Sequence, residues 1–401
     1  MKAATIGGGW LQALDIHMQS KVDLHIAFYA NWSESSFKGR DTTYHVITPD
    51  QIRTSNLKNV IRPHIIQEED TKQYIDIVER VKPDLIHIHG TENSYATILQ
   101  HVNIPVLVSI QGLMDPYAYR LSVDSQGDMQ VHISKSGRNV KTLLFERSQK
   151  HQFELLQLMG IRERKYMKQT RNFMGRTDWD RRVCQVVSPD SRYFHGDEIL
   201  RNEFYHEIWK PRTERKKLII HTTSSDSLLK GFKTVAHAAK LLKDAGFDFE
   251  WRLAGISPDS AVVRILKKQM KNEFQKLPIV LLGKMPSEIL TKKLMEADVF
   301  VLPSNIENSP NSLCEAMLLS MPCISTNSGG TPSLLSDGVE GLLVQPGDPW
   351  SLAGAVMDIK NNYSRAIEMG QCARLRAVQR HDPDRIINQV MAAYQSILEE
   401  K

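Results

Sequence analysis

The chain has 401 residues, 41% of them hydrophobic and 24% charged, a composition typical of a globular enzyme with room for two hydrophobic cores. Its net charge of +5 is too small and dispersed for a nucleic-acid-binding protein, but it suits an anionic ligand or light peripheral contact with a membrane. The four cysteines form no close pair and no apolar run approaches the roughly 20 residues that span a bilayer, so we expect a cytoplasmic protein with reduced thiols and no metal site.

The N-terminus begins with a short apolar segment, Met1–Ile6, which is followed by Gly7, Gly8 and Gly9. It lacks the apolar core of a signal peptide. Three consecutive glycines either present bare backbone amides to an anion or form only a flexible turn, and the pattern leaves both possibilities open. The GxGxxG spacing of a dinucleotide fingerprint is missing.

Strands and helices then alternate through the first half of the chain. Strands are predicted at 23–29, 44–48, 84–89 and 105–110, and helices at 11–17, 70–81 and 91–101. Repeated units of this length predict a parallel sheet covered on both faces, and such sheets bind ligands at the carboxyl ends of their strands. The residues at these ends are His89, Gly90, Thr91, Gln111 and Gly112.

The middle of the chain is less regular. Residues 123–138 are polar and basic and are predicted to form a surface excursion before a long helix over 141–168. The segment 173–180, FMGRTDWD, predicts a strand end followed by a helix that begins at Asp178. Arg176 in this turn either pairs with a ligand or anchors a domain edge. Residues 188–215 show no sustained period and are predicted to be a boundary.

The alternation restarts beyond this boundary. Strands are predicted at 218–223, 249–254, 279–282, 299–302 and 323–325, and helices at 231–245, 261–273, 286–297, 311–320, 350–360, 365–380 and 383–399. This order predicts an α/β fold with two Rossmann-like doubly wound domains that face each other across a cleft. We expect an N-terminal domain over 1–200, a linker over 201–216, a C-terminal domain over 217–380, and a last helix, 381–401, that packs back on the N-terminal domain.

The stretch 303–332 holds the strongest candidate for a binding site. Glu307 and Glu315 bracket the start of the helix at 311–320, whose unpaired amides and positive dipole end suit a phosphate. Carboxylates would repel that phosphate, so they fit the hydroxyl groups on either side of a diphosphate, as in a nucleotide sugar. Lys230 and Gly231, predicted to lie two strands away in the same sheet, could neutralise and approach the diphosphate.

Simpler interpretations of these residues stay open. A glutamate in a first helical turn is favoured by the helix dipole without any ligand. Asparagines such as Asn305, Asn308 and Asn311 are common turn formers, and most loop lysines are only solvated.

Several motifs resemble the retaining glycosyltransferases of family 4, which have the GT-B fold. They are ENSPNSLCE with the residues after it, the SSDSLLKGF loop, the GGGW turn and the GRTDWD stretch. The resemblance implies that Glu307 contacts the donor sugar, that Glu315 contacts the ribose, and that Lys230, Ser312 and Leu313 hold the diphosphate. It also implies a donor-binding role for Gly8, Gly9, Gln111, Ser224, Gly231, Gly255, Gly283, Met285, Asn308, Ser309 and Asn311.

The resemblance implies metal-independent hexosyl transfer with retention, without a cofactor, in which Glu307 and Lys230 are the catalytic residues. A UDP-sugar is the first choice of donor and GDP-mannose the second. The implied acceptor is a hydroxyl of a glycan or lipid-linked glycan in cell-surface polysaccharide synthesis, met at the inner face of the membrane.

Two positions depart from the family pattern. Ser224 stands where many members carry an arginine, and Gln111 stands where many carry a histidine. These departures keep open a catalytically silent nucleotide-sugar-binding subunit. A nucleotide-sugar epimerase of the same fold is a further alternative, although epimerases usually lack this glutamate spacing.

Overall fold

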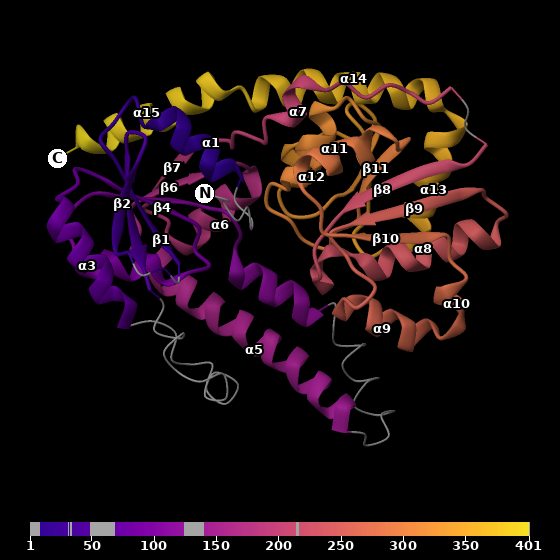
Figure 1. Cartoon of the computed structure of the whole chain (residues 1–401), viewed down its shortest axis with the longest axis horizontal. Coiled ribbons are helices and arrows are strands. Elements are labelled where there is room, and N and C mark those ends of the chain that lie inside the picture. The colour runs from indigo at the N-terminus through magenta and orange to yellow at the C-terminus, as the bar shows by residue number, and fades with distance from the viewer. Residues whose placement is uncertain are drawn as a thin grey trace. The chain divides into compact units, whose positions relative to one another are not determined.

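The computed structural model describes residues 9–30, 32, 34–48, 69–123, 140–213 and 216–400. The chain forms two α/β units (Figure 1). The first comprises residues 1–176, 180–198 and 383–401, and the second comprises 177–179 and 199–382. The predicted strand at Met1–Ile6, Gly8 and the excursion at 124–138 lie outside the described residues.

The first unit contains two sheets. One has the order β1-β3-β2, formed by Leu24–Tyr29, Thr42–Ile47 and Ser36–Gly39. The other is entirely parallel, with the order β4-β5-β6-β7, formed by Ile86–His89, Val106–Ser109, Asn172–Gly175 and Arg192–His195. The antiparallel pairing of β2 with β3 was not predicted, because β2 has only four residues and no apolar alternation.

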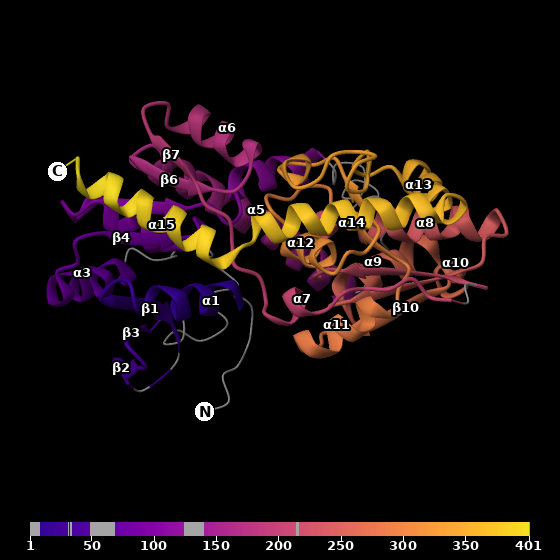
Figure 2. The ribbon, with the colours of Figure 1, turned by 90° about the horizontal axis from the view of Figure 1, so that it is seen from above.

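The helices of the first unit follow the predicted order. They include α1 (Gly9–Met18), α3 (Glu69–Val81), α5 (Val140–Met167), α6 (Asp178–Val187) and α15 (Pro383–Leu398). A further helical segment at 114–123 was not predicted. The helix predicted at 91–101 is instead a 3₁₀ helix, η2 (Ser94–Gln100). Helix α15, at the end of the chain, packs against α1 near its beginning (Figure 2).

The second unit is built on one parallel six-stranded sheet with the order β10-β9-β8-β11-β12-β13. These strands are Ile279–Gly283, Phe249–Ala254, Leu218–Thr223, Val299–Leu302, Cys323–Thr326 and Leu342–Val344. Strands β8, β11 and β12 are buried along almost their whole length, as expected for inner strands of a parallel sheet covered on both faces. The order reverses between β8 and β11, which is the topological switch point where such sheets bind ligands.

Helices cover both faces of this sheet, with α8 and α9 on one face and α11 and α12 on the other (Figure 1). The helices of the unit are α7 (Glu203–His206), α8 (Phe232–Asp244), α9 (Ala261–Met270), α10 (Asn272–Gln275), α11 (Ser287–Met295), α12 (Asn311–Leu318), α13 (Pro349–Asn361) and α14 (Tyr363–Arg380). The single helix predicted at 261–273 is interrupted at Lys271, whose φ of 51° is left-handed.

Residues 188–215 are more ordered than their sequence pattern indicates. They contain β7 and α7, and from Ile199 onward they belong to the second unit. Phe204 and Trp209 are buried in its core, and the Trp209 indole N–H donates to the carbonyl of Ala297 at 2.7 Å. A period-based prediction misses this segment because single buried aromatics, rather than a repeating apolar face, hold it in place.

His221 is an exception within the apolar core of the second unit. It is fully buried in β8, and neither ring nitrogen has a hydrogen-bond partner among the described residues. Burial, with a smaller contribution from Arg252, lowers the pKa of His221 from 6.5 to about 3. The folded protein therefore holds this histidine neutral, whereas the unfolded chain protonates it below about pH 6.5.

We predict that His221→Leu raises the free energy of unfolding and flattens its dependence on acid pH. Between the two pKa values the unfolded state binds one more proton, so this residue costs about 1.4 kcal/mol of stability per pH unit as the pH falls. Removal of the unpaired ring should add about 1–2 kcal/mol near neutral pH. Urea unfolding from about pH 7 down to about pH 4 measures both effects. Parallel curves for the two proteins would contradict the assignment.

Candidate active site

The candidate site lies at the carboxyl ends of β8 and β11 in the second unit. Strand β8 leads through a loop and the short 3₁₀ helix η3 (Leu228–Lys230) into α8, and β11 leads through residues 303–310 into α12. The prediction that the two loops are two strands apart was wrong, because β11 pairs directly with β8. Strands β9 and β10 lie between them in sequence but are added on the other side of β8.

Lys230 and Glu307 meet at this edge. The Lys230 Nζ lies 2.7 Å from the Glu307 Oε1, and the Ser304 hydroxyl donates to the same oxygen at 2.8 Å. The glutamate is buried, whereas a third of the lysine side chain is exposed. The positively charged Lys230 and the negatively charged Glu307 therefore contact each other beside the start of α12. Ser304 was not predicted as a site residue, because a serine at a strand end carries no distinctive signal.

Glycines allow the loops around this pair to pack closely. Gly231 is left-handed, with φ of +72°, and a Cβ there would lie 1.8 Å from the carbonyl oxygen of Pro303. Gly329 has φ of +52°, and a Cβ there would lie 2.0 Å from the carbonyl oxygen of Glu307, which also accepts the Gly330 N–H at 2.9 Å. The backbone on both sides of Glu307 is therefore fixed by contacts that only glycine permits.

We predict that Gly231→Ala disrupts the site while Gly246→Ala does not. Both glycines flank α8 and both are left-handed, but a Cβ at Gly246 meets no atom within 4 Å. Each substitution should cost about 1 kcal/mol for the backbone conformation. At Gly231 the clash with Pro303 should add to this cost and displace Lys230. Thermal unfolding of the two variants measures the difference, and equal melting temperatures would contradict the close-packing role.

The start of α12 offers backbone amides, although not all of those predicted. The Leu313 N–H donates to the carbonyl of Pro310 at 3.0 Å, so it is already used in the first turn. Ser312 and Asn311 are half-buried at the helix start, and Asn308 and Ser309 are buried in the preceding loop. A phosphate at this position would therefore contact the first residues of the helix, with Lys230 beside them.

Glu315 is buried on α12 and is held by a partner that the sequence did not reveal. The Arg201 Nε and Nη2 each donate to one of its carboxylate oxygens at 2.6 Å. Burial raises the pKa of Glu315 above its ordinary value, and the hydrogen bonds from Arg201 oppose that rise. The two residues are 114 positions apart in sequence, so no local pattern could have joined them.

Ser224, Gly255 and Gly283 are joined along the carboxyl edge of β8, β9 and β10. The Ser224 N–H donates to the carbonyl of Ala254 at 3.0 Å, and the Gly255 N–H donates to that of Gly283 at 2.7 Å. Gly255 is left-handed, and a Cβ there would lie 1.9 Å from the carbonyl oxygen of Ser224. Met285, just beyond β10, is half-buried against the core. These positions form a continuous polypeptide edge next to the loop of Lys230.

In the first unit, Arg176 has a structural anchoring role. Its guanidinium lies 2.7 Å from Glu198, and both side chains are 5% exposed. It also donates to the carbonyl of Gln111 at 3.0 Å, and so fixes the position of this predicted site residue after β5. Of the two interpretations of Arg176, the anchoring one accounts for these contacts. Gly9, the other predicted residue near the N-terminus, is the first residue of α1.

Two further polar residues of the first unit lie at the end of β4, of which Glu92 was not predicted and His89 was named as a strand-end position. Glu92 follows β4 and accepts the Gly112 N–H at 3.0 Å, and burial raises the pKa of its carboxyl group. His89 ends β4, and burial lowers its pKa to about 4, so it is held neutral. Its ring lies 4.0 Å, centroid to centroid, from that of His87. The position of His89 could be read from the sequence, whereas Glu92 lies one residue beyond the strand-end positions considered.

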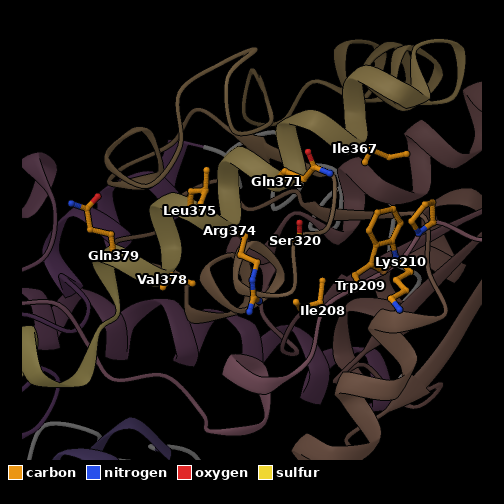
Figure 3. A pocket seen from close by; sticks show the side chains of 11 residues that line it. Ile208, Trp209, Lys210, Ser320, Ile367, Gln371, Arg374, Leu375, Val378 and Gln379 are labelled. Atoms are coloured by element: carbon orange, nitrogen blue, oxygen red, sulfur yellow. The ribbon is translucent and has the colours of Figure 1, made fainter.

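The described part of the chain contains no cluster of three or more His, Cys, Asp or Glu residues that could hold a metal ion. None of its helices is both long and apolar enough to cross a bilayer. An apolar groove of about 630 Å³ runs along α14, lined by residues that include Ile208, Trp209, Leu375 and Val378 (Figure 3). None of the predicted site residues lines this groove.

Comparison with solved structures identifies the fold. Sucrose-phosphate synthase from Thermosynechococcus elongatus superposes with a TM-score of 0.72 at 15% identity, covering 97% of this chain and 92% of that one. Anabaena HepE, solved in complex with UDP and glucose, superposes with a TM-score of 0.63 at 15% identity, covering 99% and 98%. These likenesses and the sheet order confirm the predicted GT-B fold.

Sequence comparison identifies the domain that carries the site. Residues 216–362 match the family described as glycosyl transferases group 1. A putative colanic acid biosynthesis glycosyltransferase, WcaL, from Salmonella typhimurium is 34% identical over 135 residues, 32% of each chain. The amylovoran biosynthesis glycosyltransferase AmsK from Erwinia amylovora is 29% identical over 153 residues, 37% of each. The chain thus spans only about a third of the length of these curated relatives.

The residues that match glycosyl transferases group 1 lie within the second unit, and the fold is GT-B. Lys230, Glu307 and Glu315 all lie within the matched residues, whereas Arg201 lies before them.

Proposed function

We propose that the protein is a retaining glycosyltransferase that transfers a hexose from a nucleotide-diphosphate sugar to a hydroxyl group of a glycan or lipid-linked glycan. The observation that carries this proposal is the ion pair of Lys230 and Glu307 at the switch point of the sheet, beside the start of α12. Ligands bind such sheets at this point, and a helix start favours phosphate.

The three charged side chains take different parts of the donor in this proposal. Lys230 and the first amides of α12 neutralise the diphosphate, Glu307 accepts hydrogen bonds from the hexose hydroxyls, and Glu315 accepts them from the ribose diol. Ser224 carries no charge, so Lys230 supplies most of the side-chain neutralisation at this edge. Gly255, Gly283 and Met285 lie where the base would contact the polypeptide edge beyond β8.

The proposed reaction needs no covalent intermediate. The bond from the sugar C1 to the leaving phosphate oxygen breaks as the acceptor oxygen forms a new bond to C1 on the same face. The departing diphosphate takes the proton of the acceptor hydroxyl. Because negative charge grows on the diphosphate, preorganised amides and Lys230 stabilise the transition state more than the ground state. We propose that transfer is metal-independent.

We propose a UDP-sugar as the donor, with GDP-mannose as the second choice. Solved structures of the same fold support the first choice, since those of Anabaena HepE contain UDP, glucose and UDP-glucose. The partial similarity to WcaL and AmsK supports an acceptor in polysaccharide biosynthesis. Such an acceptor would be lipid-linked and would bring the protein to the inner face of the membrane.

The experiment that tests this function has two stages. Thermal-shift measurements with UDP, GDP, UDP-glucose and GDP-mannose should show stabilisation by one nucleotide and its sugar, because a ligand that binds only the folded state raises the melting temperature. The selected nucleotide sugar should then be hydrolysed slowly without an acceptor, with the α-anomer released first as seen by NMR. Binding without any turnover would instead favour the silent subunit, and binding of none of the four would contradict the proposal.

A further inference from the structure

Arg201 is held rigidly beside Glu315 by the core of the second unit. Its guanidinium lies over the ring of Phe204, 4.9 Å from the centroid, and this ring is fully buried. The Leu200 N–H before it donates to the Tyr205 hydroxyl at 3.0 Å, and that hydroxyl donates to the carbonyl of His381. The backbone and the side chain of Arg201 are thus both fixed, so its hydrogen bonds to Glu315 are preorganised.

The two hydrogen bonds from Arg201 leave one lone pair on each carboxylate oxygen of Glu315. A carboxylate has about four lone-pair positions, and the two hydrogen bonds from Arg201 use one on each oxygen. A diol could therefore donate one hydrogen bond to each remaining lone pair. About a third of the Arg201 side chain is exposed, whereas 4% of the Glu315 side chain is.

Burial is the largest influence on the pKa of Glu315, and Arg201 is the partner that opposes it. Desolvation and the negative charge of Glu203 favour the neutral acid, and Arg201 favours the carboxylate. The other titratable or charged groups on the surrounding elements are Tyr205 on α7, Glu288 on α11, Cys314 on α12, Cys323 on β12 and Arg374 on α14. Of these groups, Arg201 is the one that forms hydrogen bonds with both carboxylate oxygens.

We propose that Arg201 is a positioning residue for nucleotide recognition, which keeps Glu315 ionised and oriented so that it can accept both hydroxyls of the ribose. This inference rests on the proposed function, in which Glu315 contacts that diol. It adds that recognition of the diol depends on a residue outside the glycosyl transferases group 1 match, contributed by the segment at 199–209.

The test compares Arg201→Gln with a matched control, Arg212→Gln. Arg212 also binds a buried carboxylate, that of Asp298, through Nε and Nη2. The exposed fractions of the side chains match closely: 31% for Arg212 and 32% for Arg201, and 0% for Asp298 and 4% for Glu315. Dissociation constants are measured by calorimetry for whichever of UDP and GDP the wild-type protein binds, and for its 2′-deoxy analogue. The measurements run from about pH 7 to about pH 9, where a buried, unpaired glutamate titrates.

Wild-type protein should prefer the ribonucleotide at every pH. Arg201→Gln should weaken binding of the ribonucleotide about tenfold near pH 7 and remove the preference for the ribonucleotide over its 2′-deoxy analogue. The affinity of this variant should recover as the pH rises, because Glu315 then ionises. Arg212→Gln should lower the melting temperature without these changes. Arg201→Lys keeps the positive charge but donates from a single nitrogen, so it should bind the ribonucleotide more weakly than wild type with little dependence on pH. This variant replaces Arg201→Gln in the test if the glutamine variant does not fold.

Two outcomes separate failure of this inference from failure of the proposed function. If wild-type protein binds neither UDP nor GDP, the nucleotide-sugar function itself is wrong. The other case is that wild-type protein binds UDP or GDP, and that the Arg201 variant that folds, Gln or Lys, keeps the same affinity, pH profile and preference for the ribonucleotide. Arg201 then has only a structural role.

Discussion

Glu307→Gln should remove almost all glycosyl transfer while leaving nucleotide binding intact. The substitution keeps the shape of the side chain but removes the negative charge that Lys230 and Ser304 now contact. A neutral amide binds the hydroxyls of the hexose more weakly, and it no longer balances the positive charge that develops at C1 in the transition state. A loss of about a hundredfold to a thousandfold in turnover is expected, as for the removal of other preorganised electrostatic groups.

The measurement is the rate of sugar transfer, or of slow donor hydrolysis, together with the dissociation constant of the free nucleotide. A suitable control is Glu340→Gln, because Glu340 is also a mostly buried glutamate in an ion pair, with Arg376 at 3.1 Å, but has no assigned role in the site. This control should keep full activity. Undiminished transfer by the Glu307 variant would remove this residue from the mechanism.

The parts of the site that the sequence predicted are those encoded locally. Each loop follows an apolar strand and precedes a helix, so the positions of Lys230 and Glu307 at one edge follow from the strand pattern alone. Their direct contact does not follow, because it depends on whether β11 or another strand lies beside β8. Strand order is decided by crossovers that local periodicity does not encode, which is why the predicted separation of two strands was wrong.

Arg201 shows a different reason why prediction fails. Its segment has no repeating apolar face, so residues 201–216 resemble a linker, and yet Phe204 and Trp209 anchor them in the core of the second unit. The sequence pattern does not indicate the polar contact between Arg201 and Glu315, which are 114 positions apart, because that contact depends on the anchoring of the segment. The fold class is thus readable from strand and helix periods, whereas the partners of buried carboxylates such as Glu315 are a product of tertiary packing.

Lys230→Ala should weaken binding of the diphosphate itself, in contrast with the substitution at Glu307. Charge-assisted hydrogen bonds to phosphate contribute about 1.5–3 kcal/mol, so the affinity for UDP or GDP should fall about tenfold to a hundredfold. The affinity for the corresponding monophosphate should fall much less if Lys230 faces the second phosphate. Calorimetric titration with both nucleotides measures this difference directly.

The same substitution should also destabilise the free protein, because it leaves the buried Glu307 without its cation. Breaking a fully buried pair costs about 3–5 kcal/mol, but the Lys230 side chain is 33% exposed, so a loss of about 1–3 kcal/mol is expected. The double variant Lys230→Ala with Glu307→Gln removes the unpaired charge and should regain most of that stability without regaining affinity for the diphosphate. Recovery of both quantities in the double variant would mean that Lys230 serves only to neutralise Glu307, and the diphosphate would then be bound by the amides of α12 alone.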